Sequence, residues 1–175
     1  MNRFARERLF RMTVDYVKQG TAAFELLEDE KTGVSIGQQF RELLADTPDL
    51  IAFHPELATY LRDYPRAELD PSVEILFSAL RDFGLKPTVT ITHAVGYQPE
   101  GTEDAVVAWK LVYASHYFNG GLNVTTYAKD GDTSYLVQLV RKRADSLGGM
   151  FGGVKRGKMA SAIEDSLVKF LEGTR

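Results

Sequence analysis

Thr88-Val-Thr-Ile-Thr-His-Ala-Val95 is the stretch that decides the fold, because the spacing of apolar residues changes there from a helical period to alternation. β-branched residues dominate it, as they do in strands. Three more segments of this kind follow, separated by short runs that contain glycine. Because short loops join antiparallel neighbours, we expect a four-stranded antiparallel meander with strands at 88–97, 105–118, 122–129 and 133–144.

The chain before this stretch has helical spacing. Apolar residues recur every three or four positions in 3–18, and Ser35 followed by Gln38 is typical of a helix N-terminus. Pro48 marks a further helix start, and residues 71–84 begin with proline and read as another amphipathic helix that ends at a glycine.

After the strands, residues 146–172 carry a last apolar stripe at helical spacing. A four-stranded meander needs one face covered, so this helix is expected to pack on the sheet. We therefore predict an α+β fold in a single domain, residues 1–175. Its parts are a mainly helical segment (1–84), an antiparallel sheet (85–145) and a long C-terminal helix (146–175).

Composition excludes several classes of protein. The 175 residues are 44% hydrophobic and 26% charged, and no apolar run approaches the ~20 residues of a membrane span. A net charge of −3 argues against nucleic acid as a partner. Because cysteine is absent and the three histidines are scattered, we expect neither a disulfide nor a metal site, and no motif indicates a cofactor.

Residues 147–158, Leu-Gly-Gly-Met-Phe-Gly-Gly-Val-Lys-Arg-Gly-Lys, hold five of the 15 glycines at the start of the expected C-terminal helix. Free backbone N–H groups at a helix start would bind an anionic head group with help from nearby cations. The candidates for those cations are Arg141, Arg143, Lys155 and Arg156. The alternative is that the glycines let the helix approach the sheet closely. Met159 argues against a phosphate-binding P-loop, because Ser or Thr should stand there to hold magnesium.

An aromatic stripe follows the second expected strand, where Trp109, Tyr113 and Tyr117 share one parity. Counting from a turn centred on Gly120 places Tyr127 opposite Tyr113. Such a stripe is typical of core packing, and it would also suit the wall of an apolar cavity.

Two histidines fall on the expected sheet. The same counting places His116 at the end of the sheet that meets the glycine-rich run, with Arg141 near Gly120. His93 pairs with about Lys110 and shares a face with apolar residues, so we expect a core or cavity-wall histidine.

Two segments, Tyr113-Ala-Ser-His-Tyr-Phe118 and Gly148-Gly-Met-Phe-Gly-Gly-Val-Lys-Arg156, resemble those of a group of bacterial proteins of unknown function, many of them apparently exported. In that group the matching region is the C-terminal part of a longer precursor with a signal peptide, which implies a trimmed, periplasmic chain. An antiparallel sheet closed by a C-terminal helix is also distantly similar to the helix-grip, or START-like, superfamily, and this implies a lipid-like ligand. The expected strands are fewer than is usual in that superfamily.

Three hypotheses of function follow. The first is non-catalytic binding of a small apolar or amphipathic molecule with an acidic head group, between the sheet and the C-terminal helix. Its expected site residues are His93, Trp109, Tyr113, His116, Tyr117, Tyr127, Arg141, Arg143, Lys155 and Arg156. The second is an interaction module whose basic, glycine-rich corner contacts an acidic protein or the surface of a membrane. The third is an enzyme centred on His116 and Arg141.

Overall fold

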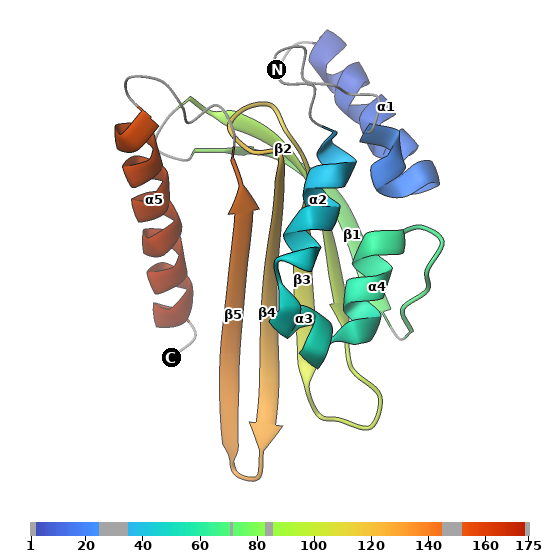
Figure 1. Cartoon of the computed structure of the whole chain (residues 1–175), viewed down its shortest axis with the longest axis vertical. Coiled ribbons are helices and arrows are strands. Elements are labelled where there is room, and N and C mark those ends of the chain that lie inside the picture. The colour runs from blue at the N-terminus through green and yellow to red at the C-terminus, as the bar shows by residue number, and fades with distance from the viewer. Residues whose placement is uncertain (1–2, 25–34, 71, 83–85, 145–151, 174–175) are drawn as a thin grey trace.

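The computed structural model describes residues 3–24, 35–70, 72–82, 86–144 and 152–173, and its centre is an open antiparallel sheet (Figure 1). Five strands pair in chain order, so the sheet is a meander. They are β1 (Ser72–Arg81), β2 (Thr88–Tyr97), β3 (Ala105–Ala114), β4 (Gly120–Asp130) and β5 (Thr133–Arg143). The α+β class and the antiparallel sheet are confirmed, whereas the expected number of strands is wrong.

The fifth strand is β1, where the sequence led us to expect a helix at 71–84. Its apolar residues occupy both parities, with Val73, Ile75 and Phe77 on one face and Leu76 and Leu80 on the other, so they fit a helical stripe as well as a strand. Pairing decides the outcome, because β1 forms a ten-residue ladder with β2. The backbone hydrogen bonds to a neighbouring strand outweigh the local pattern.

The described residues also form five α-helices and one 3₁₀ turn: α1 (Arg3–Gln19), η1 (Gly20–Phe24), α2 (Ile36–Ala45), α3 (Pro48–Phe53), α4 (Pro55–Asp63) and α5 (Gly152–Glu172). The start of α2 is the expected one, since the hydroxyl of Ser35 accepts a hydrogen bond from the backbone N–H of Gln38 at 3.2 Å. Prolines open α3 and α4 at their first position. The described part of the C-terminal helix is shorter than the expected 146–172, whose first residues lie outside the described ranges.

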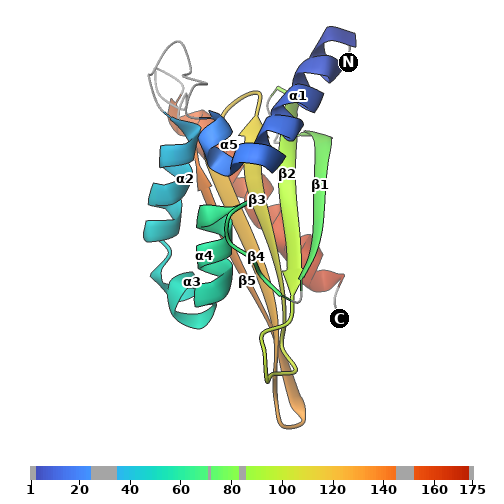
Figure 2. The ribbon, with the colours of Figure 1, turned by 90° about the vertical axis from the view of Figure 1, so that its right-hand side faces the viewer.

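The two faces of the sheet have different cover. Helices α2, α3 and α4 lie on one face, which we call the helix-covered face, and α5 lies on the opposite side of the sheet, on the α5 face (Figure 2). The main core fills the space under α2 and α4, where Phe40 and Leu57 pack near Val95, Ala108 and Leu122. A smaller cluster joins α1 to the sheet through Met12, Tyr16, Ile91 and Val112. The α5 face has no comparable core among the described residues, and the candidate site lies there.

Candidate functional site

A hollow lies on the α5 face, beside the place where α5 approaches the sheet. It has a volume of about 390 Å³, and its lining includes Phe77 of β1 together with Trp109 and Leu111 of β3. A second hollow of about 280 Å³ adjoins it, and Leu167 and Phe170 of α5 form part of its wall. The two share four lining residues: Arg81, Trp109, Asn123 and Lys142. They form one groove between the sheet and α5.

Strand pairing explains why these side chains meet. One row across the sheet runs from Ala94 through Trp109 and Asn123 to Val140, and the next row ends with Leu111, Gly121 and Lys142. Side chains directly opposite each other in an antiparallel ladder point to the same face. At Gly121 an added Cβ would lie 3.2 Å from the Leu111 Cβ, so glycine keeps the floor of the groove free.

Two buried amide groups in the groove have an oxygen without a partner. Asn123 Oδ1 and Gln138 Oε1 are inaccessible to solvent, and neither has a hydrogen-bond partner among the described residues. The amide nitrogen of Gln138 does donate to Thr125 Oγ1, at 3.4 Å. The great majority of buried polar atoms in proteins have a hydrogen-bond partner, so two exceptions in one groove require an explanation.

The groove also carries positive charge. Arg81 and Lys142 both line it, and the acidic Asp82 lines its second part. Desolvation lowers the pKa of the Lys142 ammonium from its ordinary value, and the charge of Arg81 lowers it further. The Lys142 ammonium also lies 5.2 Å from the centre of the Phe118 ring. An anionic group bound beside Lys142 would therefore relieve repulsion between two cations.

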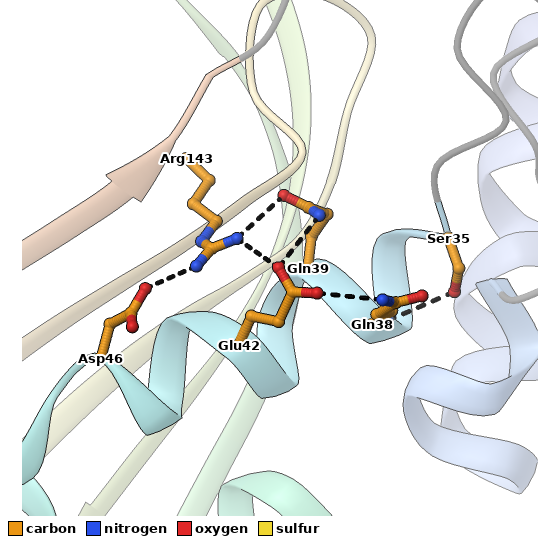
Figure 3. A network of polar contacts seen from close by, with 6 residues as sticks. All are labelled: Ser35, Gln38, Gln39, Glu42, Asp46 and Arg143. Atoms are coloured by element: carbon orange, nitrogen blue, oxygen red, sulfur yellow. Dashed lines mark hydrogen bonds and ion pairs between the residues drawn. The ribbon is translucent and has the colours of Figure 1, made fainter.

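The basic corner that the sequence predicts is not assembled as expected. Arg143, at the end of β5, bridges to Glu42 of α2 and to Asp46, the residue that caps the C-terminal end of α2, with both N–O distances at 2.5 Å (Figure 3). It also donates to the amide oxygen of Gln39 at 3.3 Å. Arg143 therefore lies on the helix-covered face, where two carboxylates neutralise it.

The other expected cations are placed less fully. Arg141 pairs with Leu122 in the ladder and is exposed. Lys155 and Arg156 lie in α5, but their side chains are outside the described part, as are residues 147–151 of the glycine-rich run. An added Cβ at Gly153 or Gly157 would meet nothing within 4 Å, so neither glycine is needed for close packing.

Of the expected aromatic stripe, Trp109 lines the groove. The pairing of Tyr127 with Tyr113 is wrong, because Tyr127 pairs with Ala105 at the far end of the strands. Tyr113 pairs with Ile91 after a register shift in the ladder, and it packs against the cluster under α1.

The loop after β3 holds His116 and Tyr117. The expected strand at 105–118 is too long, because β3 ends at Ala114, and His116 therefore lies outside the ladder. The hydroxyl of Tyr117 accepts a hydrogen bond from the backbone N–H of Lys86 at 3.2 Å. The ring of His116 is half-buried against Tyr117, with the ring centres 5.8 Å apart. An enzyme centred on His116 and Arg141 stays a prediction.

His93 pairs with Lys110, as expected, and belongs to a buried polar cluster on the helix-covered face. Its Nδ1 lies 2.9 Å from the hydroxyl of Tyr16, and its Nε2 lies 3.2 Å from a carboxylate oxygen of Glu74. Tyr60 donates to the other oxygen of the same carboxylate. Burial lowers the pKa of His93 more than Glu74 raises it, which favours the neutral ring.

Lys110 lies in the same region and is 1% exposed. Its ammonium donates to the backbone oxygen of Leu61 at 2.7 Å and lies 4.2 Å from the centre of the Phe40 ring. Sequence reasoning did not select this lysine as a functional residue. A signal was present, because Lys110 continues an inward parity that is otherwise apolar, through Val106 and Ala108.

The described residues carry few features of known functional classes. Among the described residues, no helix has the length and apolar content needed to cross a bilayer, and no three histidine or acidic side chains gather as metal ligands. No protein-family model, curated protein or solved structure matches the chain. The groove and the surface chemistry of the chain are therefore the features from which a function can be inferred.

Proposed function

We propose that this protein binds a small amphipathic molecule in the groove between the α5 face of the sheet and α5. The apolar part of the ligand would lie against Phe77, Trp109 and Leu111 on the sheet, with Leu167 and Phe170 of α5 on the other side. A groove that combines apolar walls with a few polar groups is the usual design of a small-molecule site.

The pair of buried amide oxygens carries this proposal. A buried acceptor left unpaired costs about 1–3 kcal/mol, so Asn123 and Gln138 together destabilise the free protein unless something donates to them. A ligand hydroxyl or N–H group near both oxygens would remove that cost. The head group therefore contains at least one hydrogen-bond donor.

The nearby cations specify the charge of the head group. Arg81 and Lys142 border the part of the groove that contains Asn123. A carboxylate or phosphate would form charge-assisted hydrogen bonds with them, and such bonds are stronger than neutral ones. Asp82 would disfavour a second negative charge nearby. A hydroxylated fatty acid has the required chemistry, with one acid group, one hydroxyl and an apolar chain.

The size of the groove agrees with this class of ligand. Small-molecule sites usually have a volume of about 300–1,000 Å³, and the first hollow alone has about 390 Å³. The second hollow extends it under α5, in the direction that a hydrocarbon chain would need.

Trp109 provides a direct measurement, because it is the single tryptophan of the chain and lies in the groove. We expect its emission to change on titration with hydroxydodecanoic acid, less strongly with dodecanoic acid, and least with dodecanol. Native mass spectrometry of the purified protein should show a small molecule that unfolding releases. The absence of both signals would refute the proposal.

A substitution tests the role of the amides. Asn123→Leu removes the acceptor and keeps a side chain of similar size, so the affinity for hydroxydodecanoic acid should fall about tenfold, which corresponds to about 1.4 kcal/mol. Gln98→Leu is the matched control, because Gln98 is exposed and its amide bonds Thr102 in a distant loop. Equal affinity of the Asn123→Leu variant and the wild type would show that the amide does not contact the ligand.

A further inference from the structure

The outward side of α1 carries apolar side chains that no part of the described fold covers. Phe4 and Phe10 are each 70% exposed, and Val17 is 48% exposed. The inward side of the same helix is well buried, since Tyr16 is inaccessible and Met12 is 7% exposed. The helix is therefore held to the sheet by one side while it presents two phenylalanines to the surroundings.

Basic residues share this outward side. The helix contains five basic and two acidic side chains, although the whole chain has a net charge of −3. Arg3 pairs with Glu7 at 2.8 Å on the surface. Among the described residues, Arg6, Arg8 and Arg11 have no ion-pair partner. The helix is thus a cationic element on an acidic protein.

The position of α1 suits contact with an extended surface. The helix reaches beyond the end of the sheet, and its N-terminal end lies furthest from the strands (Figure 2). Phe10 and Val17 are seven positions apart, so they lie on one line along the helix, with the half-buried Val14 between them. A flat partner could contact this line without meeting the sheet.

We propose that α1 binds the surface of an anionic lipid membrane, with Phe4 and Phe10 in the interfacial layer and the arginines at the head groups. Exposed aromatic side chains together with basic residues are the features of interfacial helices. Arginine suits this depth, because its aliphatic stem contacts apolar material while its guanidinium remains among the phosphates. A second copy of the chain is a poorer partner, because two cationic helices would repel each other.

The experiment is co-sedimentation of the full chain with vesicles of phosphatidylcholine alone or of phosphatidylcholine mixed with phosphatidylglycerol. We expect binding to the mixed vesicles, weaker binding at high salt, and little binding to phosphatidylcholine. Replacing both aromatic residues (Phe4→Ser with Phe10→Ser) should lower the partition coefficient about tenfold or more, because two buried phenyl groups are lost.

Phe53→Ser is the matched control, since Phe53 is 78% exposed but lies on α3. It should bind vesicles as the wild type does. Equal loss in the control and in the α1 variant, or no binding to anionic vesicles at all, would overturn the proposal. Sedimentation velocity without lipid tests whether α1 instead binds a second copy of the chain. If the wild type is a dimer and the α1 variant is a monomer, α1 is a contact between copies, and the membrane proposal is overturned.

Discussion

We expect Lys110 to give the protein an unusual dependence of stability on pH, and this is the sharpest prediction from the structure. The side chain is completely buried, and its ammonium has one backbone carbonyl and aromatic rings around it in place of a carboxylate. Burial lowers the pKa of Lys110 from 10.5 to about 7. The perturbation is Lys110→Met, which keeps an unbranched side chain and removes the titrating group.

The sign follows from proton binding. Between pH 7 and 10.5 the unfolded chain keeps the lysine proton, whereas the folded chain has lost it. The unfolded state therefore binds more protons, and the free energy of unfolding rises with pH by about 1.4 kcal/mol per unit. Between about pH 7.5 and 9.5 the gain is roughly 2–3 kcal/mol. Below pH 7 the burial penalty is present in full and the lysine contributes no slope.

Buried tyrosines set the highest pH at which this rise in the free energy of unfolding continues. Burial raises the pKa of Tyr97 to about 12, and it also raises the pKa values of Tyr16, Tyr60 and Tyr64 above the ordinary value of 10. These tyrosines ionise first in the unfolded chain, so they lower the free energy of unfolding above about pH 10. The rise that Lys110 causes should therefore turn into a fall near that pH.

Urea unfolding followed by Trp109 fluorescence measures the effect. We expect the wild type to gain stability from about pH 7.5 to 9.5 and the Lys110→Met variant to lose most of this slope. Lys86→Met is the control, because Lys86 is exposed and its replacement should leave the slope unchanged. A wild-type stability that is flat or falling over this range, or an unchanged slope in the Lys110→Met variant, would refute the reasoning.

Two further predictions concern the ends of β5 and α5. Arg143→Gln should lower the free energy of unfolding by about 1 kcal/mol, and by less at high salt, since the bridges to Glu42 and Asp46 are only partly buried. The control is Arg141→Gln, which replaces an exposed arginine of the same strand and should leave the free energy of unfolding unchanged. Gly157→Ala should raise the helix content and the melting temperature, with a gain of up to about 1 kcal/mol, because nothing occupies the space of the added methyl group. A loss of stability in the Gly157→Ala variant would show that α5 needs glycine there for a close contact.

The sequence predicts the sheet well where the two faces of a strand differ in environment. β2 is the best case, because its observed bounds agree with the expected 88–97 and its inward residues Ile91, His93, Val95 and Tyr97 are buried. β1 is the opposite case. It is an edge strand with apolar residues on both faces, and Val73 and Ile75 are exposed beside the groove. Without a buried face to define the period, the pattern could not separate a strand from a helix.

The expected register around Gly120 fails because of the length of one loop. Strand β3 ends at Ala114, and a loop of five residues leads to β4. Tyr127 therefore pairs with Ala105, eight positions before its expected partner Tyr113. An even shift moves a side chain along the sheet and keeps it on the same face. Trp109 could therefore be assigned to a cavity wall from its parity alone, whereas the neighbours of His116 and Tyr127 could not.

Buried polar groups have different explanations on the two faces of the sheet. On the helix-covered face, His93 and Lys110 have partners, so packing and hydrogen bonding within the fold account for them. On the α5 face, Asn123 and Gln138 have unpaired oxygens, and apolar residues at both positions would keep the same strand pairing. Folding alone therefore favours their replacement. Asn123→Leu should leave the free protein as stable as the wild type or make it more stable, and it should weaken ligand binding. A residue with a structural role would show the opposite effect on stability, so the two measurements together separate a binding residue from a structural one.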